Sequence, residues 1–242
     1  MPTLNNFYEE ISKKYNIELS TKELEKFKKF LQIFKEKNSK INLSSIRTDD
    51  DIINKHFIDS IILNSFLDFK SLTKNKKIKI ADIGTWWWFP WIPLAITNPE
   101  LNFTLIDSVW KKIIAVGEFC EKLNLKNIKT LNKRAEEIWQ DKRYREKFDF
   151  VVSRATAYFP TLLEYSIPLL KIWWIFIAYK LDDKEELKIA KKSLIKLGAK
   201  IIRVKNYKLV NQKRTLVFIE KIKKTAEKYP RRVGIPQKEP IV

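Results

Sequence analysis

The stretch Ala81-Asp82-Ile83-Gly84-Thr85-Trp86-Trp87-Trp88-Phe89-Pro90-Trp91-Ile92-Pro93 joins an apolar strand to a helix. A turn of this kind that holds a nucleotide cofactor needs residues that tolerate positive φ and let the backbone approach the ligand, which only Gly does cheaply. Tryptophans stand there instead, and their indoles would fill the space that a cofactor requires. The stretch therefore has the position of a cofactor-binding turn and the side chains of a blocked one.

The glycine content of the whole chain points in the same direction. The 242 residues include 4 Gly and 8 Trp, whereas Gly averages about 7% of residues in proteins. Other tryptophans also occupy places that suit glycine. Trp110 follows a strand end, Trp139 lies near a helix end, and Trp173-Trp174 fall in a predicted helix-to-strand turn.

Two interpretations of these tryptophans stay open. In the first, all eight are glycines of a lineage that reads the UGA codon as Gly, translated with a table that reads it as Trp. In the second, the tryptophans are real and the site is plugged. The codons distinguish the two, because UGA supports the first interpretation and UGG the second.

Length and composition limit the class of protein. A chain of 242 residues fits one α/β domain with an added segment. No apolar run is long enough to span a bilayer and no signal pattern begins the chain, so we expect a soluble, cytoplasmic protein. We also expect it to be a monomer. The single Cys120 and the single His56 exclude an internal disulfide and a cysteine-based metal cluster, and leave little for zinc or a Ser-His system. We therefore predict no metal site.

The formal net charge of +19 has two explanations. Clustered Lys and Arg bind phosphates with release of counterions, which indicates a polyanionic partner. AT-rich coding, on the other hand, inflates Lys, Ile and Asn together, and Lys is spread over nearly every predicted helix surface. Charge alone therefore does not establish RNA binding.

The first 70 residues have helical patterns. Apolar residues recur at helical spacing from Leu4 to Tyr15, and Ser20-Thr21-Lys22-Glu23 has the spacing of a capping box before the next helix. Thr48 and the acidic residues after it predict the start of a third helix, which continues to about Phe66. Residues 1–70 are thus a helical segment, 71–225 the main domain and 226–242 a basic tail.

Short apolar strands alternate with helices after this segment. The pattern predicts right-handed crossovers and a parallel sheet covered on both faces. Two final strands follow the helix Asp183 to Leu197 without another helix between them, so they would add an antiparallel edge. The predicted strands are Ile78 to Gly84, Asn102 to Asp107, Ile128 to Asn132, Phe148 to Ser153, Ile175 to Lys180, about Lys200 to Tyr207, and Thr215 to Lys221.

Three strand ends carry candidate binding residues. Asp107 ends the second strand, roughly 20 residues after Gly84, where an acid reaches a ribose hydroxyl pair; alternatively it caps the next helix. Arg134-Ala135-Glu136-Glu137 follows the third strand, and a backbone amide there could contact an adenine edge, or the segment simply starts a helix. Arg154 ends the fourth strand at the switch point, where it could hold a carboxylate or a phosphate, or form a surface ion pair.

Two further groups are weaker candidates. The segment Tyr229 to Pro236, with Lys228 and Lys238, is a basic, turn-forming tail that we expect not to be helical and that suits RNA phosphates, although disordered basic tails are common. His56 and Asp59 share one helix face and could be a catalytic pair, or His56 could be structural.

These motifs together resemble the bacterial ribosomal RNA small subunit methyltransferase G family, also called glucose-inhibited division protein B. The family places a 7-methylguanosine in 16S rRNA with S-adenosylmethionine. The resemblance is carried by Asn38 to Ser44, His56-Phe57-Ile58-Asp59-Ser60, Ala81 to Ile96, Asp107-Ser108, Arg134 to Glu137, Ser153-Arg154-Ala155, Tyr179-Lys180 and Lys228 to Pro236.

The resemblance implies a fold and a cofactor site. The fold is a Rossmann-like α/β methyltransferase sheet, mostly parallel, with seven strands, an antiparallel edge and an N-terminal helical extension. The cofactor contacts are Gly84, Phe89, Ala135, Glu136 and Arg154, with Asp107 added by its position after the second strand. RNA contacts are expected at His56, Lys228, Arg231 and Arg232. The family has Gly where this chain has Trp86, Trp88, Trp91, Trp110, Trp173 and Trp174, and Trp87 falls on a variable position.

The implied reaction suits a chain without an obvious catalytic base. Guanine N7 has an in-plane lone pair and no hydrogen at neutral pH, so it can attack a sulfonium methyl directly and no catalytic residue is assigned. The enzyme aligns the reactants, and Phe89 or Tyr158 could stack on the guanine. The alternatives are an RNA-binding pseudoenzyme with a blocked pocket and a nucleotide-dependent oxidoreductase, although the latter leaves the Phe-Pro-x-Ile-Pro segment and the basic tail unexplained.

Overall fold

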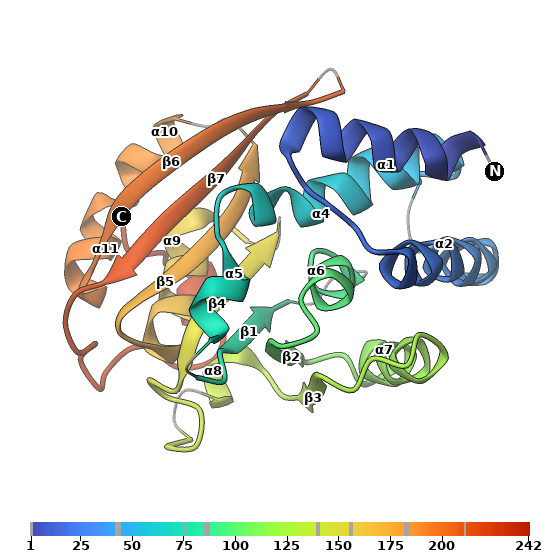
Figure 1. Ribbon diagram of the computed structural model, residues 1–242. Coiled ribbons are helices and arrows are strands. Elements are labelled where there is room, and N and C mark those ends of the chain that lie inside the picture. The colour runs from blue at the N-terminus through green and yellow to red at the C-terminus, as the bar shows by residue number, and fades with distance from the viewer. Residues whose placement is uncertain are drawn as a thin grey trace.

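Seven strands of the described residues form one sheet in the order β3-β2-β1-β4-β5-β7-β6 (Figure 1). The structure is a computed structural model that describes residues 2–41, 45–74, 76–84, 88–138, 141–154, 157–181, 184–210 and 212–242. The strands are β1 (Lys79–Ile83), β2 (Asn102–Asp107), β3 (Ile128–Asn132), β4 (Phe148–Arg154), β5 (Leu170–Leu181), β6 (Ala199–Leu209) and β7 (Gln212–Lys221). The first five strands pair in parallel, and β7 is antiparallel to both β5 and β6. The predicted fold class is confirmed.

Successive side chains of a strand point to opposite sides, and on the central strands β1 and β4 both faces are buried. On β1, Ile80 belongs to one apolar cluster and Ala81 and Ile83 to another. The helices α6 (Trp91–Thr97) and α7 (Trp110–Lys122) cover the first face together with the N-terminal helices, while α9 (Phe159–Ser166) and α11 (Lys191–Leu197) cover the second (Figure 1). The sheet is therefore doubly wound.

The N-terminal helices pack into the same core as the sheet. In α1 (Pro2–Tyr15) and α2 (Thr21–Ile41), Phe7, Phe27 and Phe30 are buried and their rings contact Phe57. The predicted capping box is confirmed: the Ser20 N–H donates to Glu23 Oε2 over 2.6 Å, and the Glu23 N–H donates to Ser20 Oγ over 3.4 Å. This packing places the segment before β1 directly over one face of the sheet.

The third predicted helix begins where expected but is not one continuous α-helix. Thr48 caps its start by accepting a hydrogen bond from the Asp51 N–H. The α-helical turn α3 (Asp49–Ile52) then widens into a π-helical turn, Ile53–Ile58, before α4 (Asp59–Ile61), a 3-10 turn and α5 (Phe69–Thr73). Periodicity of apolar residues does not reveal such a widening, which is common at functional sites.

Three local predictions need correction. Trp173 and Trp174 lie inside β5, at an irregularity in its pairing with β4, and not in a turn before the strand. The predicted last helix is two, α10 (Lys184–Ile189) and α11. The tail contains a short helix, α12 (Ile235–Lys238), because Gly234 at φ +82° turns the chain just before it. The remaining short helix is α8 (Ala135–Ile138), and the domain boundaries at residues 70 and 225 stay predictions.

Within the described ranges, no helix is both long enough and apolar enough to cross a lipid bilayer.

Candidate active site

The site candidates meet where the strand order reverses. β1 pairs with β2 on one side and with β4 on the other, so the connections from β1 and from β4 run in opposite directions. Open α/β sheets bind ligands at such a switch point, outside the carboxyl ends of the strands. Gly84 follows β1 there, Asp107 ends β2 and Arg154 ends β4.

Two described residues of the segment after β1 have the positive φ that favours Gly. Gly84 has φ +65°, and its N–H donates to the Ile106 carbonyl over 3.1 Å, which holds the turn against β2. Trp88 has φ +68°, a left-handed conformation that is an outlier for a bulky side chain. Trp86 and Trp87 lie outside the described residues. At position 88, the backbone itself thus calls for Gly.

The indoles of Trp88 and Trp91 lie in the core. The Trp88 indole is buried, and its ring centre lies 4.1 Å from that of Phe119 and 5.8 Å from that of Phe34. Trp91 is completely buried, and its Nε1 has no hydrogen-bond partner among the described residues. The Trp88 indole thus packs between α2 and α7, and the expectation that indoles fill the cofactor space stays a prediction. An orphaned indole N–H costs about 1–3 kcal/mol, which makes Trp91 a poor core residue.

Arg154 lies at the centre of a buried polar network. Its Nη1 donates to Asp59 Oδ2 over 2.9 Å and to the Lys55 carbonyl over 3.4 Å, and its guanidinium lies 5.3 Å from the Phe89 ring centre. Tyr207 donates to the other oxygen of Asp59 over 2.7 Å. The ion pair with Asp59 is buried and not on the surface, so the network fixes Arg154 at the end of β4.

His56 is held in its neutral form. Arg154 Nη2 lies 3.0 Å from His56 Nδ1 and donates to it, because a guanidinium only donates. The imidazole stacks on the Phe89 ring, with 4.4 Å between the ring centres and 14° between the ring planes. Burial, and then the charge of Arg154, lower the pKa of His56 to about 3. This environment supports the structural interpretation of His56 over a role in proton transfer.

Sequence reasoning missed Asp82. Its carboxyl is buried inside β1, and Oδ2 has no hydrogen-bond partner among the described residues. Burial raises the pKa of Asp82 well above its usual range, with Arg154 opposing and Asp107 adding to the rise. An acidic residue within the apolar run Lys79 to Ile83 was the available signal, because a buried carboxyl needs a reason to be there.

Asp107 has local partners. Its Oδ1 accepts a hydrogen bond from the Val109 N–H over 2.8 Å, and Lys112 Nζ lies 3.5 Å from Oδ2. Ile83 and Ile106 are register partners on adjacent strands, so Gly84 and Asp107 follow them side by side. Asp107 thus holds the turn between β2 and α7 but does not cap the helix, whose N-cap is Val109 without a side-chain cap, and its contact with a ribose stays a prediction.

The loop after β3 starts a helix. The Arg134 N–H donates to Glu137 Oε2 over 3.1 Å, which caps α8. The side chains of Ala135 and Glu136 lie outside the described part of the chain, as does Trp139. Their predicted cofactor contacts stay predictions.

The two candidate stacking residues differ in accessibility. Phe89 is buried and its ring face is covered by His56, which makes it unsuitable for stacking on an RNA base. Tyr158 is 41% exposed at the start of α9, just beyond the end of β4. Tyr158 is therefore the better candidate of the two.

The basic tail folds back onto the domain. Arg231 makes a two-pronged ion pair with the buried carboxylate of Glu164, with Nη2 2.7 Å from Oε2, and the Thr161 hydroxyl donates to the Pro236 carbonyl. Arg232 and Lys228 are exposed. The RNA role of these residues stays a prediction, and Arg231 has a structural partner already.

The described residues contain no group of three or more His, Cys, Asp or Glu that could hold a metal. Cys120 is half-buried, and burial raises the pKa of its thiol to about 12, so it is a poor nucleophile.

The sheet order and the switch point define the class of Rossmann-like α/β folds. Two solved structures share this fold: M. jannaschii TYW2 in complex with AdoMet (TM-score 0.52, 14% identity, 74% of this chain and 80% of that one) and a 16S rRNA (adenine(1408)-N(1))-methyltransferase with SAM from Catenulisporales acidiphilia (TM-score 0.51, 10% identity, 66% and 92%). At these identities the likeness concerns the fold alone.

Similarity in sequence identifies the family. The family model described as rRNA small subunit methyltransferase G matches residues 23–217. Relatives called ribosomal RNA small subunit methyltransferase G are 40% identical in Acetivibrio thermocellus, over 94% of this chain and 92% of the relative, and 40% identical in Lysinibacillus sphaericus, over 96% and 97%. The chain belongs to this methyltransferase family, which confirms the predicted family and enzyme class.

Proposed function

We propose that this protein transfers a methyl group from S-adenosylmethionine to N7 of a guanine in 16S rRNA, as a cytoplasmic monomer. Family membership supports the substrate, and the arrangement of Gly84, Asp107 and Arg154 around the β1/β4 switch point carries the proposal. Membership in a methyltransferase family does not favour the pseudoenzyme or the oxidoreductase.

The described residues suit the proposed cofactor. Gly84 at φ +65° brings bare backbone to the carboxyl edge, and Asp107 offers a carboxylate beside it. The orphaned oxygen of Asp82 lies at the same edge and could accept a hydrogen bond from a polar group there. Gly84, Asp107 and Arg154 would hold the cofactor, together with Phe89, Ala135 and Glu136 from the resemblance to the family.

S-adenosylmethionine supplies a methyl group on a positively charged sulfur. The guanine N7 lone pair needs no base, which agrees with a neutral His56 whose pKa is about 3. The chain's contribution is orientation: the buried ion pair of Arg154 and Asp59 fixes the rim of the site, and Tyr158 offers an exposed ring for the guanine. The buried Asp82 is placed to favour positive charge nearby once it ionises.

We also propose that the active form carries Gly at the eight Trp positions. The left-handed backbone at Trp88 and Trp173 supports this, since Gly populates such φ values without steric cost. The orphaned Nε1 of Trp91 adds to it.

The test is transfer of labelled methyl from S-adenosylmethionine to small-subunit RNA by the Gly version of the chain. We expect label in 7-methylguanosine after digestion of the RNA to nucleosides. Label in another nucleoside, or none at all, would contradict the proposed reaction.

A further inference from the structure

A groove at the amino edge of the sheet, opposite the candidate active site, is lined by cations. It has a volume of about 470 Å³ and lies over the first residues of β1, β2, β3 and β4. Its lining includes six cationic side chains and no Asp or Glu: Lys77, Lys79, Lys126, Lys129, Arg143 and Lys147. We call these residues, with the Tyr144 that lies among them, the amino-edge groove.

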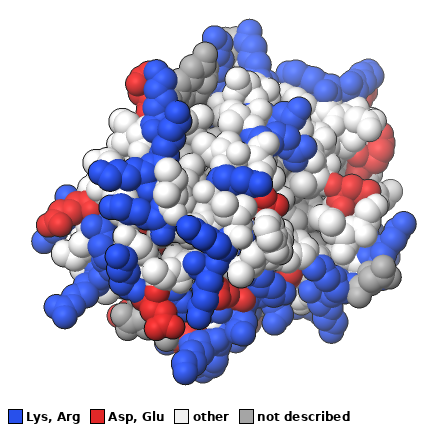
Figure 2. Space-filling view, turned by 90° about the vertical axis from the view of Figure 1, so that its left-hand side faces the viewer, with Lys and Arg blue, Asp and Glu red and all other residues white. Residues whose placement is uncertain are grey.

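This composition differs from that of the chain as a whole. Lys and Arg number 48 against 29 Asp and Glu, so three or four acidic residues would accompany six cations at the average proportion. Figure 2 shows one face of the molecule, on which red side chains are interspersed among the more numerous blue ones. AT-rich coding accounts for lysine spread over the surface, but it does not explain a groove without acids.

The lysines of the groove are not neutralised locally. Arg143 is engaged by Asp141, with Nη2 2.6 Å from Oδ2. Among the described residues, none of the five lysines forms an ion pair with a carboxylate. The nearby carboxylate of Asp149 is completely buried and pairs with Lys171 over 2.8 Å. The field of these lysines is therefore directed to solvent.

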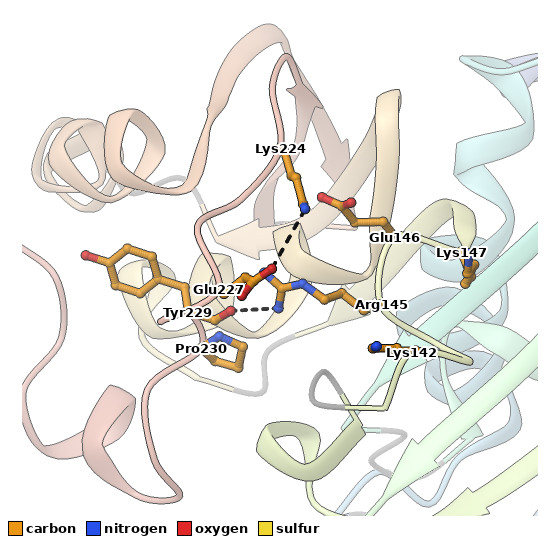
Figure 3. A pocket seen from close by; sticks show the side chains of 8 residues that line it. All are labelled: Lys142, Arg145, Glu146, Lys147, Lys224, Glu227, Tyr229 and Pro230. Atoms are coloured by element: carbon orange, nitrogen blue, oxygen red, sulfur yellow. Dashed lines mark hydrogen bonds and ion pairs between the residues drawn. The ribbon is translucent and has the colours of Figure 1, made fainter.

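A second basic pocket continues the groove. It has a volume of about 600 Å³ and shares Lys147 with the first (Figure 3). Lys142, Arg145 and Lys224 line it, and Arg145 donates to the carbonyls of Tyr229 and Thr225. One of its two acids, Glu146, is paired with Lys221 over 2.7 Å, and the other, Glu227, lies 3.9 Å from Lys224.

The groove also offers an aromatic ring. Tyr144 is half-exposed, with Lys129 Nζ 5.8 Å and the Arg143 guanidinium 5.7 Å from its ring centre. A basic groove that follows a backbone, with an aromatic side chain on which a base can stack, is the arrangement of proteins that bind single-stranded nucleic acid. An anionic membrane would instead require an amphipathic apolar face beside the charges.

We propose that the amino-edge groove binds the phosphodiester backbone of the substrate RNA as a second contact, remote from the methyl-transfer site. The inference rests on the proposed function for the identity of the RNA. The seven residues of β4 separate the two edges by about 20 Å at roughly 3.3 Å per residue. A folded RNA can reach both edges, and the groove would raise affinity without touching the reacting guanine.

The test compares two variants that each lose three exposed lysines. Lys126→Gln/Lys129→Gln/Lys147→Gln changes the groove, and Lys191→Gln/Lys192→Gln/Lys196→Gln on α11 is the control with the same change in charge. Binding of labelled small-subunit RNA is titrated over a range of salt concentrations. We expect the slope of log K against log salt to become less steep by about 2 in the groove variant, at roughly 0.7 per lost contact, and by much less in the control.

Equal changes in both variants, or no change in the groove variant, would overturn the inference. So would groove-dependent binding to anionic vesicles without groove-dependent binding to RNA. A second variant, Lys77→Gln/Lys79→Gln, repeats the test at the start of β1, and thermal unfolding checks that each variant folds. In methyl transfer we expect a higher KM for RNA and an unchanged kcat. If neither the Trp nor the Gly version of the chain transfers methyl but the salt slope still depends on the groove, the proposed function is wrong and the inference that the groove binds RNA remains supported.

Discussion

The turn after β1 and the irregular part of β5 share one backbone feature in opposite surroundings. Trp88 and Trp173 have φ values of +68° and +70°, but Trp88 is 3% exposed and Trp173 is 66% exposed. A left-handed conformation costs an L residue about 1–2 kcal/mol. The buried indole of Trp88 offsets this cost by packing, whereas the exposed indole of Trp173 has little with which to offset it. The two sites thus share a left-handed backbone conformation but differ in how much of the indole is buried.

The largest effect is expected for Trp88→Gly in the chain as written. Removal of a buried aromatic side chain costs about 3–5 kcal/mol, and relief of the left-handed backbone returns about 1–2 kcal/mol. We expect a net loss of about 2–3 kcal/mol in the free energy of unfolding, measured with denaturant. A net gain would show that the contacts with Phe34 and Phe119 contribute nothing, and the two sites would then behave alike.

His56 lies beside the same turn and makes its stability depend on pH. The pKa of His56 is about 3 in the folded protein and about 6.5 when unfolded, so the unfolded state binds a proton first as pH falls. Stability is complete above pH 6.5 and decreases toward pH 3, by up to about 1.4 kcal/mol per pH unit. We expect His56→Gln to flatten this decrease between pH 4 and 6.5. Identical slopes for both proteins would mean that His56 is not held neutral.

Two real glycines calibrate the comparison. A Cβ added at Gly198, φ +78°, would lie 2.6 Å from Lys223 Cγ and 3.0 Å from the Lys223 carbonyl oxygen, whereas one at Gly234, φ +82°, would meet nothing within 4 Å. We expect Gly234→Ala to cost about 1 kcal/mol for the backbone alone and Gly198→Ala about 2 kcal/mol or more. If both variants lost the same free energy of unfolding in denaturant, the backbone conformation would determine the cost at both positions, and the contact of the Cβ with Lys223 would add nothing.

The smallest effect is a gain. Trp173→Gly should stabilise the chain by about 1 kcal/mol, because it relieves a left-handed backbone and removes few contacts. Trp110→Gly is the matched control: Trp110 is 61% exposed but begins α7 with no positive φ, so Gly there should cost up to about 1 kcal/mol. If both substitutions raised, or both lowered, the thermal unfolding temperature, then backbone conformation would not explain the difference between the two positions.

The sequence predicted the sheet well, because β1, β2, β4 and β5 contain apolar runs and the candidate site residues lie at strand ends. Asp107 and Arg154 could be placed at the carboxyl edge for this reason. The partners of Arg154 could not be predicted, since Asp59 and Tyr207 come from distant segments. The π-helical turn that carries His56 could not be predicted either, because it does not change the spacing of apolar residues. Trp173 was assigned to a turn because a glycine-like position inside a strand reads as a strand boundary.

The amino-edge groove was outside the reach of sequence reasoning for a similar reason. Its lysines come from the starts of three separate strands, β1, β3 and β4, and along the sequence they are not distinguished from the many other lysines. Only the sheet order brings them together and leaves the acids out.

The most direct test of the whole account is isothermal titration of S-adenosylmethionine into two synthetic versions of the chain, one with Trp and one with Gly at the eight positions. The account predicts that the Gly version binds at least about tenfold more tightly, a difference of about 1.4 kcal/mol. Binding by the Trp version that is as tight as, or tighter than, binding by the Gly version would contradict it.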